Sequence, residues 1–553
     1  MMILRFTLLC CTACVLTAAA QTGPDTYWVQ FTDKDATPYS IGEPAQFLSA
    51  RAITRRQVQG ISLDETDLPV APAYVSAVLA TGDVQLINRS KWFNAITIRS
   101  TDQVALDAIG LLPFVSTVRV TRRLVAQPPQ PIDKFTLEAP PAITARGGQP
   151  EDYGLSWPQI LIHNGHLLHA FEAKGQGMLI GVLDSGFEDA DSLAAFDDLR
   201  AREGVLLTRD MVNHDGDVYD DHWHGRSVLS CMTGILPGYL QGTAPLADYA
   251  LVRTEEVAFE MVVEEDNWVA GAELLDSLGC DVLNTSLGYT TFDDSLLDHT
   301  YEQLDGLTTR ISIAAGMAAQ KGMIPVQSAG NNGWSAWHYI SAPADAIDIL
   351  TVGAVNDQGQ YAGFSSYGPS ADGRVKPDVM AVGWGAVGLR PEGDSTAYIN
   401  GTSFSSPIMA GLVTCLWQLH PDRTAHDVMD AVRRSAHLWL SPNDSMGYGI
   451  PDFMVAHAWL DLTSDVQEGA ASHEMLIFPN PFTQILAIGA PAGRDGSARF
   501  TIIDAMGRVA HEGSATMRSG FATIDGLDAL APGAYLFRLA QGGRHWSARA
   551  VKP

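Results

Sequence analysis

The longest regular pattern of hydrophobic and polar residues lies between residues 153 and 460. Strand-like apolar runs alternate there with segments that can form helices, and the clearest runs are GMLIGVLDSG, DYALVRT, CDVLNTSLG, GMIPVQSAG and AIDILTVGAV. Nearly continuous hydrophobicity is typical of strands that are covered on both faces of a parallel sheet. We therefore expect an α/β fold with a doubly wound, mostly parallel sheet. Ligands bind such sheets at the carboxyl ends of the strands, and three of the runs end in polar residues, Asp184, Ser286 and Asn331.

Two smaller units flank this region. Residues 21–125 contain alternating runs that predict strands (TYWVQF, DVQLINRS, WFNAITIRS and FVSTVRVTR) and two stretches that predict helices. Their order, β-α-β-β-α-β, predicts a compact ferredoxin-like α+β unit. Residues 475–553 contain short alternating strands between Gly and Asp turns, which predict a small all-β sandwich.

The remaining segments have the composition of linkers and of a leader. Residues 126–152 are rich in Pro, Gly and Gln, and residues 461–474 are polar, so we expect linkers there. Residues 1–20 combine one arginine, an apolar run and an Ala-x-Ala ending, which predicts a secretory signal peptide cleaved after Ala20. A lipoprotein signal that ends at Cys14 is the alternative, although its flanking residues fit poorly.

The net charge and the cysteine content of the chain limit its possible partners and its possible cross-links. The chain of 553 residues carries a formal net charge of −28, which argues against nucleic acid or anionic lipid as the main partner. Once the leader is removed, Cys231, Cys280 and Cys415 remain. An odd number of cysteines in apolar surroundings predicts buried thiols instead of a disulfide framework.

Four residues could form a catalytic set. Asp184 ends an apolar strand, His224 precedes a helical segment in DDHWHGRSVLSCMTG, and Ser403 precedes another in INGTSFSSPIMAG. Asn331 follows a strand and a glycine turn in VQSAGNNG. Each could simply begin a turn or cap a helix. Together they also suit acyl transfer, because a carboxylate can orient an imidazole that takes a hydroxyl proton, while an amide stabilises the oxyanion.

A loop rich in histidine and aspartate precedes the helical segment of His224. Together with His224, it forms a possible metal cluster whose other members are His214, Asp215, Asp217, Asp220 and His222. Their spacing matches neither a zinc motif of the H-E-x-x-H type nor an EF-hand loop. An oxygen-ligated, structural calcium ion on the loop of residues 215–221 fits better than zinc does.

The joint set of motifs is more specific than any one of them. The triad residues occur in the order Asp, His and Ser, which is the order in subtilisin. The segments GTAPLADY, NTSLG and GFSSYGP agree with it. Residues 153–460 thus resemble the subtilisin-like serine proteases, the subtilases.

The resemblance implies a role for each candidate residue. Asp184 would orient His224, and His224 would take the proton of Ser403 and pass it to the leaving amine. Asn331 and the backbone N–H of Ser403 would hold the oxyanion. No cofactor is required for this chemistry.

The substrate-lining strand of the family corresponds to Ser286, Leu287 and Gly288, to which a peptide would add as an extra strand. One departure from the family pattern is Arg226, where a threonine usually follows His-Gly. A second is the acidic segment 254–266, which would either favour basic substrates or form a solvated acidic face.

The flanking units resemble known companions of such proteases. Residues 21–125 resemble the inhibitory propeptide, which assists folding and whose tail occupies the cleft until it is cut. Residues 475–553 resemble the sorting domain of type IX secretion in Bacteroidetes, on the motifs FPNPF, DAMGR and GAY and on Lys552. A carbohydrate-binding or adhesive module is the alternative for this last unit.

These features predict a serine endopeptidase that is made as a zymogen and reaches the outside or the cell surface through the periplasm. Its partners would be protein or peptide substrates, its own propeptide and the type IX secretion machinery, but not nucleic acid. The alternative is a non-catalytic surface or adhesion protein that keeps the protease fold.

Overall fold

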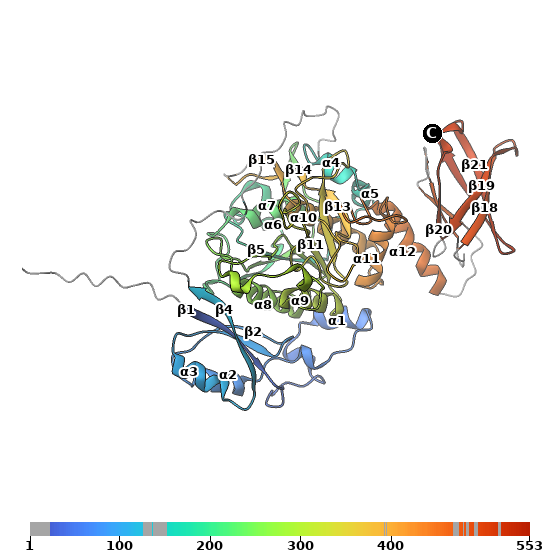
Figure 1. Ribbon diagram of the computed structural model, residues 1–553. Helices are drawn as coiled ribbons and strands as arrows, with labels where there is room; N and C mark the ends of the chain where they lie inside the picture. Colours follow the sequence, from blue (N-terminus) through green and yellow to red (C-terminus); the bar gives the residue numbers. More distant parts are fainter. Residues whose placement is uncertain are drawn as a thin grey trace, which may run out of the picture.

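The computed structural model describes residues 23–124, 135, 152–391, 393, 395–467, 475–478, 481–482, 486–490, 496–517 and 521–553. Figure 1 shows a central α/β region, an N-terminal unit below it and a C-terminal β unit to its right. The expected signal peptide and most of the segment 126–152 lie outside the described residues.

A seven-stranded sheet forms the centre of the molecule, in the order β13-β12-β11-β10-β5-β9-β6, and all its pairs are parallel. Its strands are β5 (Leu179–Asp184), β6 (Val205–Asp210), β9 (Asp248–Arg253), β10 (Val282–Thr285), β11 (Ile324–Ser328), β12 (Leu350–Val355) and β13 (Val379–Val382). The strand order reverses between β5 and β10, which is where open α/β sheets bind ligands. The expected doubly wound parallel sheet is confirmed.

Helices cover both faces of this sheet. Neighbouring residues of each strand point to opposite sides, and apolar residues on both sides pack against helices. In β5, Ile180 and Val182 belong to one hydrophobic cluster, whereas Leu179 and Leu183 belong to another. The first cluster contains α7 (Trp223–Thr233) and α10 (Thr402–Leu419), and the second contains α8 (Val263–Leu278) and α9 (Arg310–Gln320). The remaining helices are α4 (Trp157–Leu161), α5 (Gly165–Ala170), α6 (Asp197–Ala201), α11 (Ala425–Ser435) and α12 (Phe453–Gln467), and two hairpins are formed by β7 (Ile235–Leu236) with β8 (Leu240–Gln241) and by β14 (Trp384–Leu389) with β15 (Thr396–Asn400).

The N-terminal unit has the predicted ferredoxin-like topology. Its antiparallel sheet has the order β2-β3-β1-β4. The strands are β1 (Gly23–Phe31), β2 (Gln85–Ser90), β3 (Ala95–Arg99) and β4 (Val115–Leu124), and the helices are α1 (Ala50–Val58), α2 (Pro72–Leu79) and α3 (Gln103–Gly110). Helix α2 was not expected, since its segment APAYVSAVLA lacks a polar face. Strands β1, β2 and β4 and helix α1 contact α8 of the central region (Figure 1).

The C-terminal unit is a sandwich of two antiparallel sheets, β16-β17-β20 and β19-β18-β21-β22. Its strands are β16 (Leu476–Phe478), β17 (Leu486–Gly489), β18 (Gly496–Asp504), β19 (Val509–Met517), β20 (Phe521–Ile524), β21 (Gly533–Gln541) and β22 (Arg544–Lys552). Its hydrophobic core contains only its own residues. Helix α12, however, continues to Gln467, so the first half of the segment 461–474 is helical and not an irregular linker.

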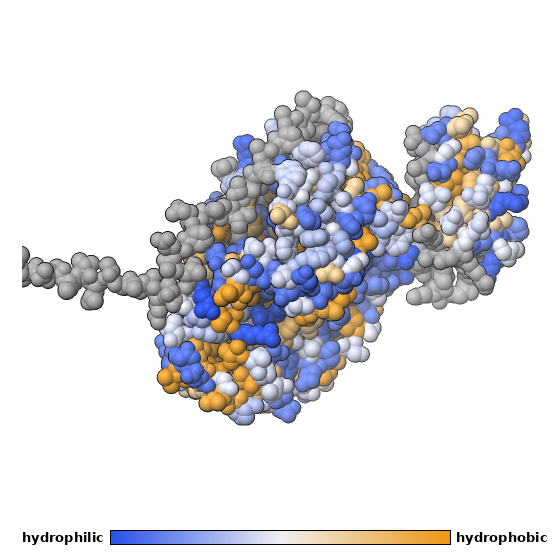
Figure 2. Space-filling model, viewed as in Figure 1, coloured by the Kyte–Doolittle hydropathy of each residue, from blue (hydrophilic) through white to orange (hydrophobic). Residues whose placement is uncertain are grey.

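The described part of the chain agrees with the prediction for the cysteines. Cys231, Cys280 and Cys415 are buried free thiols. Hydrophilic and hydrophobic residues are mixed over the face shown in Figure 2. None of the helices among the described residues combines the length and the hydrophobicity that a membrane span requires.

Candidate active site

Asp184 and His224 form a buried pair at the carboxyl end of β5. Their side chains are 0% and 3% exposed, and His224 Nδ1 lies 2.7 Å from Asp184 Oδ1. The same carboxylate oxygen accepts the backbone N–H of Ser185 at 2.8 Å. A carboxylate can only accept here, so Nδ1 carries the proton and Nε2 keeps a lone pair. This is the tautomer that a general base requires.

The start of α7 fixes the position of His224. His222 is the N-cap of this helix, and its Nδ1 accepts the backbone N–H of His224 at 3.3 Å. The glycine after His224 is required by space, because a Cβ at Gly225 would lie 2.2 Å from the carbonyl oxygen of Gly186. The His-Gly pair therefore lets the helix approach the end of β5 closely enough for the contact with Asp184.

Ser403 lies in the first turn of α10, directly after Gly401 and Thr402. Gly401 has a φ of +142°, a backbone conformation that side chains disfavour. The Ser403 hydroxyl donates to the carbonyl of Ser286 at 3.3 Å, and the Ser286 hydroxyl donates to the carbonyl of Ser403 at 2.8 Å. The second bond has a simple origin. Pro407 is four residues further along the helix and has no N–H for the Ser403 carbonyl, which therefore accepts from Ser286 instead.

Asn331 is tied to the same turn. Its Oδ1 accepts the backbone N–H of Thr402 at 2.9 Å and the Thr402 hydroxyl at 3.0 Å. With the oxygen held in this way, the amide nitrogen is the group that can donate into the cleft. The sequence motif around Ser403 did not show that Thr402 positions Asn331.

One pocket of about 430 Å³ joins most of the candidate residues. Ser286, Leu287, Gly288, Asn331 and Ser403 all line it. His224 faces the same turn of α10, since its ring lies 6.0 Å from that of Phe404, the residue after Ser403. The structure thus brings the candidate substrate strand, amide and hydroxyl together, with the Asp184–His224 pair beside them.

Phe135, from the segment between the N-terminal unit and the central region, lies in this cleft. Its ring is 4.1 Å from that of His224 and 5.2 Å from that of His222, and it lines the pocket that contains Ser403. An aromatic residue of the chain itself therefore occupies space in front of the candidate catalytic residues.

The acidic segment 254–266 is not a solvated face. Glu255 and Glu264 are each 1% exposed, and the Tyr289 hydroxyl donates to Glu255. Glu255, Glu260 and Asp293 line the pocket beside the substrate strand. The run of carboxylates in the sequence indicated a charged feature, but only the fold shows which of them reach the cleft.

The other departure, Arg226, is not among the described residues that line the pocket. Its side chain is 1% exposed, and its guanidinium donates to the carbonyls of Glu188 and Arg390 at 3.0 and 2.9 Å. It therefore connects α7 to two loops of the central region, and the Asp184–His224 contact forms with this arginine after His-Gly.

The loop that precedes α7 uses its carboxylates for other contacts. Asp215 and Asp217 accept backbone N–H groups of the loop at 3.1 and 2.8 Å, and Asp221 lies 3.0 Å from Arg253. Burial raises the pKa of Asp221 to about 6, although Arg253 lowers it. A calcium ion in this loop stays a prediction.

Comparisons with known proteins identify a family for each of the three parts of the chain. The family model of the subtilase family matches residues 175–457, that of the Bacteroidota S8 propeptide domain matches residues 26–134, and that of a secretion-system C-terminal sorting domain matches residues 476–552. The chain is 26% identical over 307 residues to "Serine protease AprX" of Bacillus subtilis (strain 168), an alignment that covers 50% of this chain and 64% of that protein. It is 28% identical over 274 residues to "Subtilisin NAT" of Bacillus subtilis subsp. natto, covering 49% of this chain and 63% of that protein.

Among solved structures, the MycP3 protease from the type VII (ESX-3) secretion system is 21% identical, with a TM-score of 0.44 over 60% of this chain and 93% of that one. The sequence alignments with AprX and subtilisin NAT each span slightly less than two thirds of those proteins. The subtilase model alone matches just over half of the chain. The chain belongs to the subtilase family of serine proteases, with an S8 propeptide domain before the peptidase region and a type IX sorting domain after it that marks it for secretion or the cell surface.

Proposed function

We propose that this chain is an endopeptidase that cleaves peptide bonds through the triad Asp184, His224 and Ser403. The observation that carries the proposal is the 2.7 Å contact between Asp184 and His224 at the end of β5, beside the turn that holds Ser403. His224 Nε2 takes the proton of the Ser403 hydroxyl as its oxygen attacks the scissile carbonyl. The protonated imidazole then gives this proton to the leaving amine, and Asp184 stabilises the imidazolium in between.

The Ser403 hydroxyl must turn for this step. It donates to the carbonyl of Ser286 at 3.3 Å in the structure, and a rotation about its χ1 bond would have to redirect it to His224 Nε2. Such contacts in free enzymes often tighten only when substrate binds. The amide nitrogen of Asn331 and the backbone N–H of Ser403 then stabilise the oxyanion of the tetrahedral intermediate. In the second half of the reaction, His224 takes a proton from water, which attacks the acyl-enzyme, and then gives that proton to the Ser403 oxygen as it leaves.

The N-terminal unit keeps the enzyme inactive in this proposal. Phe135 lies 4.1 Å from the His224 ring, so a substrate cannot occupy that space until the segment has moved. Ser286, Leu287 and Gly288 line the pocket on which the substrate backbone would add as a strand. Cleavage of the connecting segment and release of the N-terminal unit would therefore activate the enzyme.

Fluorophosphonate labelling tests this proposal. Processed protein should react once, and peptide mapping should place the adduct on Ser403. The matched control is Ser192→Ala, which removes an exposed serine hydroxyl bound to the Asp189 carbonyl, and this variant should label normally. A peptide blocked at both ends should be cut internally. An enzyme that removes only terminal residues, or an adduct on another serine, would contradict the proposal.

A further inference from the structure

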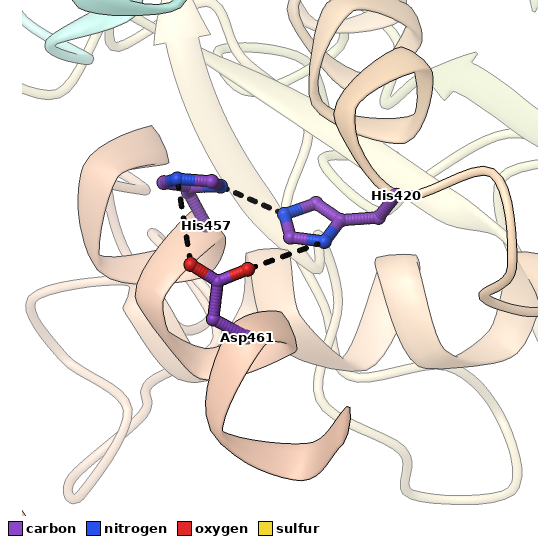
Figure 3. Close-up of side chains that lie close together, drawn as sticks. All are labelled: His420, His457 and Asp461. Carbon is purple, nitrogen blue, oxygen red and sulfur yellow. Dashed lines mark hydrogen bonds and ion pairs between the residues drawn. The ribbon is translucent and has the colours of Figure 1, made fainter. Parts of the chain in front are cut away.

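Two histidines and one aspartate meet between the C-terminal end of α10 and helix α12, away from the candidate active site. His420 is the C-cap residue of α10, and His457 and Asp461 are four residues apart on α12. Figure 3 shows the three side chains pointing toward one another. His420 Nε2 lies 2.8 Å from His457 Nδ1. The Asp461 carboxylate lies 3.7 Å from His420 Nδ1 and 3.6 Å from His457 Nε2.

We propose that His420, His457 and Asp461 form a zinc site that fastens the end of α10 to α12. One ring nitrogen of each histidine and one carboxylate oxygen lie within 4.8 Å of one another. Imidazole and carboxylate ligands suit zinc, whereas calcium prefers oxygen ligands alone. Ligands about 2.0–2.1 Å from a tetrahedral zinc ion lie roughly 3.3 Å apart. The three donor atoms, which lie within 4.8 Å of one another, would therefore have to approach by at most about 1.5 Å through side-chain rotations to reach this geometry.

The three side chains differ in their exposure to solvent, so the cluster has a buried side and an open side. The His420 side chain is 4% exposed, that of His457 is 22% exposed and that of Asp461 is 60% exposed. The buried histidine fixes one ligand, and the exposed aspartate leaves one side open for water as a fourth ligand. The other charges near His420 are Asp422 and Arg423, which are of opposite sign. Asp461 thus supplies the negative charge that a cation needs here.

The position of this site on α10 gives it a structural consequence. The same helix begins with the turn that holds Ser403 and ends at Leu419, directly before His420. Helix α12 is the last helix before the C-terminal unit. Zinc would therefore fix the far end of the helix that carries the candidate nucleophile, and it would act on stability and not on the chemical step. This inference is independent of the proposed catalysis.

Zinc binding by the full chain, in a Ser403→Ala background that prevents self-digestion, tests the inference. Metal analysis after dialysis against Zn²⁺ should find one bound ion, which EDTA removes. Saturating Zn²⁺ should raise the Tm by about 3–5 °C at 100 times the Kd. Co²⁺ in place of zinc should give the intense visible absorption of a tetrahedral ion.

Two variants and one control separate this site from other histidines. His457→Ala, and independently Asp461→Asn at an exposed position, should each weaken zinc binding by about 100-fold or more, because loss of an outer-shell partner alone costs 10–100-fold. His426→Ala removes an exposed histidine of α11 and should leave zinc binding unchanged. Absence of bound zinc in the parent protein, or zinc binding by the two site variants that is as tight as that of the parent, would overturn the inference.

Discussion

Substitution of Asp276 by asparagine should release the N-terminal unit from the peptidase region. The Asp276 carboxylate, on α8, lies 2.6 Å from Arg55, 2.9 Å from Arg56 and 2.9 Å from Lys91, all three from the N-terminal unit. Burial opposes ionisation of this carboxyl group, but the three cations hold its pKa well below the usual range. The contact is therefore a buried charge cluster across the boundary between the two units.

The expected change in the dissociation rate follows from the ion pairs that the three cations lose. Breaking a buried ion pair by removing one partner costs about 3–5 kcal/mol. Asparagine keeps one acceptor oxygen, and Asp67 still pairs with Arg56 at 2.8 Å, so we take the lower end, about 3 kcal/mol. At about 1.4 kcal/mol per factor of ten, this corresponds to roughly 10²-fold faster dissociation of the N-terminal unit.

The assay uses the full chain with Ser403→Ala and a foreign protease site placed between residues 136 and 150. After cleavage at that site, interferometry on the immobilised peptidase region records how fast the N-terminal unit leaves. Glu172→Gln is the charge-matched control, because its side chain is 82% exposed. A rate for Asp276→Asn within about threefold of the parent rate would refute the reasoning.

Three further predictions follow from the same structure. Asn331→Ala should lower kcat by about 10²–10³-fold with little change in KM, as loss of the oxyanion amide does in subtilisin; a change below threefold in steady-state assays would mean that another group stabilises the oxyanion. Burial raises the pKa of Glu273 to about 7, although Lys91 lowers it. An exposed glutamate has a pKa of about 4.3, so between these two pH values Glu273 takes up a proton when the N-terminal unit binds. Dissociation in the same interferometry assay should therefore slow as the pH falls from 7 to 5, and Glu273→Gln should remove this part of the pH dependence; an identical pH profile would contradict the assignment. A chain that ends at residue 474 should mature and cleave peptides at near wild-type rates because the sandwich has its own core, but in the native host it should stay in the periplasm; delivery to the surface, or loss of most peptidase activity, would contradict the separation of roles.

The sequence was most informative where local pattern and tertiary environment agree. Continuous apolar runs predicted five strands of the central sheet, and the polar residues at the ends of these runs, Asp184, Ser286 and Asn331, lie at or near the carboxyl ends of the observed strands β5, β10 and β11. Strands β6 and β13 were not expected, since VLLTRD resembles a half-exposed segment and VMAV is very short.

Contacts between distant segments could not be predicted from the pattern. The acidic segment 254–266 has the composition of a solvated surface, yet Glu264 is buried and accepts backbone N–H groups of Glu256 and Met261. Similarly, nothing in the sequence places Phe135 beside His224 or His420 beside His457. Such juxtapositions depend on how the helices cross, and no local propensity encodes that.

The central claim is that the Asp184–His224 pair activates Ser403, and the rate of Ser403 acylation tests it most directly. The second-order rate constant for fluorophosphonate labelling should be compared between processed wild-type protein and an Asp184→Asn variant matured by added protease. We expect the adduct on Ser403 in both, with a rate roughly 10⁴-fold lower in the variant, because asparagine favours the wrong imidazole tautomer. Equal rates in the two proteins, or an adduct on a different residue, would contradict the claim.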